Sequence, residues 1–170
     1  AQGIEVDERP LDRARADLVI DTTNLSPGAL KRVVDDHFDM GVQPGMSIFV
    51  TSFSFRVGLP RDADLVFDVR FLANPHYDPE LREMTGLQEP VARFIRGDEG
   101  LEPFLKTLAG LMRPLLPRYA AEGKSYLTIA IGCTGGRHRS VFIAEELGQW
   151  LQDEGHPVHL HHRDLNKTQK

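Results

Sequence analysis

The chain has 170 residues, of which 41% are hydrophobic, and a formal net charge of −5 at pH 7, values that suit one globular domain or one domain with a piece of another. No apolar run approaches the length of a membrane span, and the chain shows no signal-peptide pattern. The single cysteine, Cys133, excludes an intrachain disulfide framework and favours a reducing compartment, so we expect a cytoplasmic protein without a membrane partner.

Residues 1–41 look like the end of a domain. Residues 17–21 predict a short strand, and a helical pattern comes next that ends at Gly41. One strand and one helix cannot form a core of their own. The segment therefore packs on the remainder of the chain, belongs to a larger domain, or pairs with another copy in a homo-oligomer. The linker composition after the helix predicts a second domain at residues 42–170.

The second segment alternates between expected strands and helices. Strands are expected at residues 46–51, 64–72, 127–131 and 158–160, and helices at residues 101–119 and from residue 141 to Gly155. Pro114 and Pro117 should kink or shorten the end of the first helix. The alternation predicts an α/β fold with a mainly parallel sheet flanked by helices, and a ligand crevice at the carboxyl ends of the strands.

Residues 126–141, with the sequence YLTIAIGCTGGRHRSV, combine an apolar strand, a glycine-rich turn and the start of a helix. The glycines permit backbone conformations in which several N–H groups converge on one point. Arg137, His138 and Arg139 add cationic donors where the N-terminus of a helix already favours an anion. The stretch therefore predicts an anion cradle, most simply for a phosphate group.

The loop after the second expected strand offers further donors. Arg70 lies near the end of this strand, and Asn74 and His76 lie in a polar loop where two prolines exclude regular structure. Because the carboxyl ends of parallel strands meet at one edge, this loop should approach the glycine-rich turn. Two alternatives stay open: Arg70 forms an ion pair with Asp68 or Asp64, and His76 is an ordinary hydrogen-bonded loop residue.

The glycine-rich turn also has a catalytic interpretation. Cys133 and Arg139 are separated by five residues and followed by a serine, the spacing of the phosphate loop of cysteine-dependent phosphatases. There, a thiolate attacks the phosphoryl group that the arginine and the backbone N–H groups hold. Gly132 stands where those enzymes have a histidine, and no Trp-Pro-Asp loop occurs. Asp68 or Asp78 would have to serve as general acid.

The end of the chain is locally basic. Arg163, Lys167 and Lys170 stand against Asp164 in the last fifteen residues, a balance of +2, with several histidines nearby. Contacts to phosphates depend on local potential, so RNA binding there is compatible with the acidic total. Alternate histidines on a strand more often face solvent than bind metal, and we expect no metal site.

Three motifs succeed one another along the chain: DLVFDVRFLANPH at residues 64–76, MTGL with PV at residues 84–91, and SYLTIAIGCTGGRHRSV at residues 125–141. Their combination and order resemble the RapZ/YvcJ family of bacterial nucleotide-binding proteins. Members have an N-terminal P-loop kinase-like domain, but no Gly-x-x-x-x-Gly-Lys-Ser/Thr pattern occurs here. The resemblance therefore implies the C-terminal domain with a remnant of the first. ATP or GTP binding belongs to the domain that this sequence lacks, and no cofactor is expected here.

The resemblance also implies a function. In enterobacterial members this domain binds RNA, the protein presents a small RNA to ribonuclease E, and it senses glucosamine-6-phosphate, so we expect binding without turnover. The implied contacts to the phosphosugar are His76, Thr134, Gly135 and Arg139, followed by Gly136, Ser140, Arg70, Asn74, Arg137 and His138. The expected RNA contacts are Arg163, Lys167, Lys170 and His162.

Overall fold

The computed structural model describes residue 20 and residues 46–166. The chain divides into two compact units, Ala1–Val42 and Gln43–Lys170, and all the helices and strands named in this section belong to the second. The strand predicted at residues 17–21, save Ile20, and the helix predicted to end at Gly41 lie outside the described residues.

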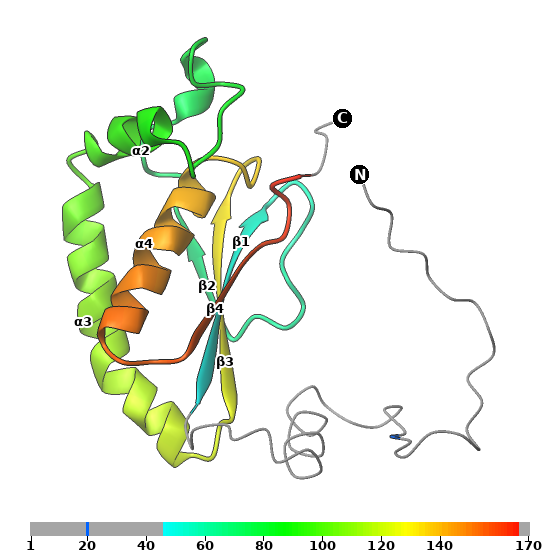
Figure 1. The fold of residues 1–170 in the computed structure, drawn as a ribbon, viewed down its shortest axis with the longest axis vertical. Helices are drawn as coiled ribbons and strands as arrows, with labels where there is room; N and C mark the ends of the chain where they lie inside the picture. The colour runs from blue at the N-terminus through cyan, green and yellow to red at the C-terminus, as the bar shows by residue number, and fades with distance from the viewer. Residues whose placement is uncertain (1–19, 21–45, 167–170) are drawn as a thin grey trace. The chain divides into compact units, whose positions relative to one another are not determined.

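The second unit is built on a four-stranded parallel sheet with the strand order β2-β3-β1-β4 (Figure 1). The central strands are β1 (Ser47–Ser54) and β3 (Tyr126–Cys133), and the edge strands are β2 (Leu65–Asp68) and β4 (Val158–His162). Both central strands are mostly buried, and β3 is almost continuously apolar, as expected for parallel strands in the middle of a sheet. The α/β fold with a parallel sheet is thus confirmed.

The pairing register aligns the carboxyl ends of β1, β2 and β3 with one another. Ser54 at the end of β1 lies opposite Cys133, and Asp68 at the end of β2 lies opposite Gly132. The loops after β1, β2 and β3 therefore leave the sheet from the same edge.

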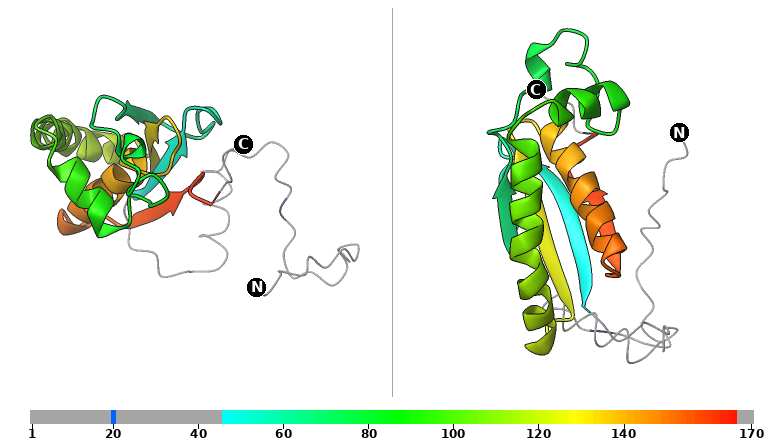
Figure 2. Two further views of the ribbon diagram at one scale, coloured as in Figure 1. Left: turned by 90° about the horizontal axis from the view of Figure 1, so that it is seen from above. Right: turned by 90° about the vertical axis from the view of Figure 1, so that its left-hand side faces the viewer.

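Helices complete the unit. They are η2 (Pro75–Tyr77), a 3-10 helix, and the α-helices α2 (Glu89–Arg96), α3 (Leu101–Ala121) and α4 (Arg139–Asp153). In both figures, α3 and α4 lie against the same face of the sheet (Figures 1 and 2). Within the described part of the chain, no helix is long and apolar enough to cross a membrane.

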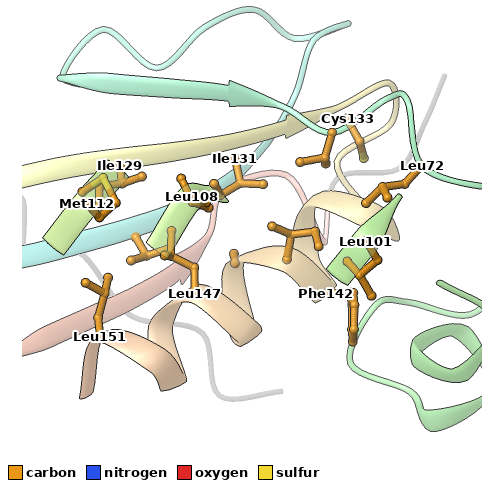
Figure 3. Close-up of a cluster of buried hydrophobic side chains, with 14 of the residues drawn as sticks. Leu72, Leu101, Leu108, Met112, Ile129, Ile131, Cys133, Phe142, Leu147 and Leu151 are labelled. Atoms are coloured by element: carbon orange, nitrogen blue, oxygen red, sulfur yellow. The ribbon is translucent and has the colours of Figure 1, made fainter. Parts of the chain in front are cut away.

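The core lies between these two helices and the sheet (Figure 3). Leu147 and Leu151 of α4, one turn apart, share this cluster with Leu108 and Met112 of α3 and with Ile129 of β3. Full burial of each such side chain contributes about 1.5–3 kcal/mol, so this stripe holds α4 and its N-terminus in place at the end of β3.

The strand predicted at residues 64–72 and the loop predicted after it differ from the structure. The strand predicted to reach residue 72 ends at Asp68, because the Asp68 carboxylate accepts the backbone N–H of Arg70 at 2.9 Å and closes a turn. The loop in which regular structure was excluded contains η2. Pro75 occupies a first-turn position where no N–H donor is required, and Asn74 accepts the N–H of His76.

Pro114 and Pro117 were predicted to kink or shorten the end of their helix, and shortening is excluded because α3 continues to Ala121. Both prolines lie on the exposed side of the helix, where water can satisfy the carbonyls that lose a donor. Met112 and Leu116 are buried and hold this part of the helix against the sheet.

Candidate anion-binding site

A cavity of about 640 Å³ lies at the carboxyl edge of the sheet. Its walls come from the loop after β1, the region of η2, the segment before α2, the β3–α4 turn and the segment after β4. The lining residues are Arg56, Asn74, His76, Tyr77, Arg82, Glu83, Cys133, Thr134, Gly135, Arg137, His138, Arg139, Leu165 and Asn166.

The cavity brings together most of the expected phosphosugar contacts. Asn74, His76, Thr134, Gly135, Arg137, His138 and Arg139 all line it. Arg70, Gly136 and Ser140 are not among the lining residues. Cationic side chains predominate, and of the described residues that line the cavity Glu83 alone is acidic. The arrangement therefore favours an anionic ligand.

Arg139, the first residue of α4, is a buried cation at this cavity. Its side chain is 4% exposed, and its Nη1 donates to the carbonyl oxygens of Arg70 at 2.8 Å and Leu72 at 3.0 Å. It forms no ion pair with a carboxylate of the described residues. Its Nε is the only buried side-chain nitrogen or oxygen of those residues without a hydrogen-bond partner. Because buried charges are normally paired, this geometry favours an anion at the cavity.

Gly136 and Ser140 contact the sulfur of Cys133. The N–H of Gly136 donates to Sγ at 3.2 Å, and the Ser140 hydroxyl lies 3.1 Å from Sγ. Gly136 has a φ of +67°, and a Cβ there would lie 2.8 Å from the backbone nitrogen of Ser54, so the turn requires glycine. Cys133, the last residue of β3, is 3% exposed and is among the residues that line the cavity.

Arg137 and His138 fasten the turn to the segment before α2. The guanidinium of Arg137 donates to the carbonyls of Met84, at 2.9 Å, and Glu83. The His138 Nε2 lies 3.2 Å from the carbonyl of Arg82. Burial lowers the pKa of His138, which makes the neutral ring the form present at pH 7. A carbonyl can only accept, so we assign the proton to Nε2.

Arg70 is held outside the cavity by an ion pair. Its Nη2 lies 2.6 Å from Oδ2 of Asp68, and its guanidinium lies 4.2 Å from the ring centroid of Phe55. The hydrogen bond from Arg70 lowers the pKa of the Asp68 carboxyl. Arg70 contributes to the site through its backbone, because its carbonyl accepts the hydrogen bond from Arg139.

Six lining residues were not predicted from the sequence: Arg56, Tyr77, Arg82, Glu83, Leu165 and Asn166. Arg56 had a usable signal, because it comes after β1 and the ends of parallel strands meet at one edge. Tyr77 had the same signal, because it belongs to η2 in the loop after β2. The other four lie in irregular segments whose course the sequence pattern does not give.

Of the four expected RNA contacts, the structure describes two, His162 and Arg163. Lys167 and Lys170 lie outside the described residues. His162 contacts Ser52 Oγ through Nδ1 and Glu145 Oε1 through Nε2, each at 2.9 Å, and Arg163 donates to the carbonyl of Gly58 at 2.7 Å and pairs with Asp164. These two side chains thus tie the end of the sheet together. Among the residues that the structure describes, no cluster of three or more His, Cys, Asp or Glu side chains suits a metal ion.

Comparison with known proteins supports the resemblance. The profile of the RapZ C-terminal domain matches residues 46–166. The chain is 59% identical over 158 residues to a nucleotide-binding protein of Paramagnetospirillum magneticum. This match covers 93% of this chain and 51% of that protein. For nucleotide-binding proteins of Rhodospirillum centenum and Rhodospirillum rubrum, the identities are 56% over 155 residues and 54% over 156 residues. The matches cover 91% and 92% of this chain and 47% and 49% of those proteins. The chain spans about half the length of these curated relatives. It belongs to the RapZ family, and residues 46–166 match the C-terminal domain of that family.

Proposed function

We propose that this domain binds a phosphorylated small molecule in the cavity and acts as a regulatory or adaptor domain, not as an enzyme. The observation that carries the proposal is the buried guanidinium of Arg139, which interacts with the charge of Asp68 but forms no ion pair with a carboxylate of the described residues, and whose Nε is unpartnered. A phosphate group supplies the missing negative charge, and the N-terminus of α4 adds favourable partial charge.

The ligand class is a sugar phosphate, with an amino-sugar phosphate such as glucosamine-6-phosphate as the first candidate. The volume of about 640 Å³ falls in the range of small-molecule sites and exceeds what one phosphate group needs. The lining residues include Asn74, Asn166 and Thr134, whose amide and hydroxyl groups suit sugar hydroxyls. The Glu83 carboxylate at the same cavity suits an ammonium group.

Isothermal titration calorimetry with glucosamine-6-phosphate tests the proposal. His76→Ala and Arg139→Ala should each weaken binding by at least about tenfold, the effect of losing one charge-assisted hydrogen bond. Arg93→Ala is a matched control, because this arginine is exposed and lies 3.8 Å from Glu89, away from the cavity lining. A folded wild-type protein that gives no heat with any sugar phosphate would contradict the proposal.

Phosphatase activity is the second candidate, favoured by the contacts of the Cys133 sulfur with Gly136 and Ser140 at the cavity. Asp68 pairs with Arg70, and neither Asp68 nor Asp78 lines the cavity, so neither side chain is placed as general acid. The appropriate substrate is therefore p-nitrophenyl phosphate, whose leaving group departs as the phenolate without a proton.

The reaction would run in two steps. The Cys133 thiolate forms a bond to phosphorus as the bond from phosphorus to the phenolate breaks, and water then cleaves the phosphorus–sulfur bond, restoring the thiolate and releasing phosphate and one proton. Under this hypothesis, Cys133→Ser abolishes hydrolysis but retains phosphate binding. Absence of hydrolysis by the wild-type protein would exclude it.

Other implications of the family stay predictions. They are RNA binding near Arg163, a ribonuclease partner, homo-oligomer formation, and ATP or GTP binding by a P-loop domain that this sequence lacks. The names of the three relatives describe whole proteins as nucleotide-binding, and this chain spans about half of each.

A further inference from the structure

Tyr77 presents an exposed aromatic ring at the cavity. Its side chain is 81% exposed, more than that of any other large hydrophobic residue that the structure describes, and the residue lines the cavity. An exposed aromatic ring on a loop is ordinary by itself. Here the ring lies beside the proposed anion site, and inorganic phosphate alone has no apolar surface that would pack against an aromatic ring.

The backbone around Tyr77 is fixed by several hydrogen bonds. The N–H of Tyr77 donates to the carbonyl of Asn74 at 3.2 Å, and the next N–H, of Asp78, donates to the carbonyl of Pro75 at 3.0 Å. From the next segment, Nε of Arg82 donates to the carbonyl of His76 at 3.1 Å. These bonds fix the backbone that carries the ring, and the ring centroid lies 6.2 Å from that of His76. The residue stays largely exposed, so a ligand can reach it without the cost of ordering the loop.

The polar groups of the cavity indicate what kind of ring would lie on Tyr77. Asn74, Asn166 and Glu83 are among the residues that line the same cavity, and their side chains carry hydrogen-bond donors and acceptors suited to hydroxyl groups. A pyranose has hydroxyl groups around its edge and a face of C–H groups that can pack against an aromatic ring. These features favour a sugar over a nucleobase, which would also stack on a tyrosine.

We propose that Tyr77 forms the sugar-ring subsite of the cavity and determines its specificity, so that phosphorylated pyranoses bind more tightly than inorganic phosphate or acyclic phosphate esters. The proposal rests on the phosphate site proposed above. In this arrangement Arg139 and the glycine-rich turn bind the phosphate, and Tyr77 selects what the phosphate is attached to.

Calorimetry with inorganic phosphate, glycerol-3-phosphate and glucose-6-phosphate tests the subsite. Tyr77→Ala should weaken binding of glucose-6-phosphate about tenfold and leave binding of inorganic phosphate and glycerol-3-phosphate unchanged, since only the pyranose loses an aromatic contact. Tyr77→Phe keeps the ring and should bind glucose-6-phosphate as the wild type does. Leu59→Ala is the control, because Leu59 is 58% exposed and does not line the cavity.

The outcomes separate the two proposals. If none of the three compounds binds the wild-type protein, the phosphate site itself is refuted. If phosphate binds but Tyr77→Ala leaves glucose-6-phosphate affinity unchanged, the sugar subsite is refuted and the phosphate site stands. A further titration with adenosine monophosphate tests for a nucleobase subsite. If Tyr77→Ala weakens binding of adenosine monophosphate and not of glucose-6-phosphate, the ring subsite is one for nucleobases and the proposal is overturned.

Discussion

At the scale of single residues, Arg139 makes contacts that a lysine could not reproduce. Its planar guanidinium reaches two carbonyls, of Arg70 and Leu72, through one nitrogen and leaves further N–H groups for a ligand. Lysine keeps the charge but concentrates its donors at one point. We expect Arg139→Lys to lower phosphate affinity about tenfold and the free energy of unfolding by about 1–3 kcal/mol.

Calorimetry with inorganic phosphate and urea denaturation measure the two effects separately. Arg93→Lys, at an exposed position, should change neither quantity. If Arg139→Lys binds phosphate like the wild type, the guanidinium geometry has no part in the site.

His138 makes stability depend on pH. Burial, followed by the charge of Arg137, lowers its pKa below the ordinary value of 6.5. At pH values between the folded-state pKa of His138 and 6.5, the unfolded chain binds more protons than the folded chain. The contribution of His138 to the free energy of unfolding is therefore fully present above pH 6.5 and is lost as the pH falls through the folded-state pKa. We expect His138→Gln, whose amide keeps a donor for the Arg82 carbonyl, to reduce this fall.

Urea denaturation between pH 7.5 and pH 5 tests the prediction. The slope of unfolding free energy against pH should be smaller for His138→Gln than for the wild type, whereas His161→Gln, at an exposed position, should keep the wild-type slope. An unchanged slope in His138→Gln would mean that His138 does not titrate differently on folding.

The residue types of the site were predictable, but their roles were not. Cations beside a glycine-rich turn predict an anion site, and the structure places Arg139 and His138 at one cavity. The sequence could not show that Arg137 and His138 donate to the carbonyls of Glu83, Met84 and Arg82, because those contacts depend on how a loop more than fifty residues away folds back.

At the scale of elements, the segment before α2 packs against the start of α4 at Gly86. A Cβ on Gly86 would lie 2.6 Å from the backbone nitrogen of Phe142 and would also collide with the carbonyl of His138. Neither backbone atom can yield without moving α4. We therefore expect Gly86→Ala to lower the free energy of unfolding by about 3 kcal/mol and to weaken phosphate binding, because α4 carries Arg139.

Gly110 is the matched control for this substitution. It lies in the exposed part of α3, and nothing lies within 4 Å of a Cβ added there. Gly110→Ala should raise the unfolding free energy by about 0.5–1 kcal/mol. Equal effects of the two alanine substitutions in urea denaturation would contradict the close approach at Gly86.

Long apolar patterns predicted their elements well, and short ones did not. β3 and α3 were visible in the sequence, because β3 is an almost unbroken apolar run and the apolar stripe of α3 recurs along a helix of 21 residues. The eight-residue α2, with Val91, Ala92 and Ile95 buried, gave too short a pattern. The buried Val69 and Leu72 extended the apparent strand of β2, since burial in a turn and burial in a strand look alike in sequence.

At the scale of the whole molecule, the topology explains why the site could be anticipated in outline. Four parallel strands end at one edge, so the loops that carry His76 and Thr134 had to meet there. The same rule does not say which side chains of irregular segments reach the cavity. Leu165 and Asn166 reach it because the chain after β4 is held by Asp164, which accepts the N–H of Ser54 at 2.8 Å.

The walls of the cavity come from segments between Arg56 and Asn166, which only the folded chain brings together. A ligand that bridges these walls binds the folded state and not the unfolded chain, so it must stabilise the whole fold. At one hundred times its Kd, glucosamine-6-phosphate should add about 2.7 kcal/mol to the free energy of unfolding and raise the Tm on the order of 10 °C, measured by circular dichroism.

Unphosphorylated glucosamine at the same concentration should leave the Tm unchanged. His76→Ala removes an exposed side chain, so it should fold like the wild type but need more ligand for the same shift. An equal shift in that variant would place the stabilising site elsewhere.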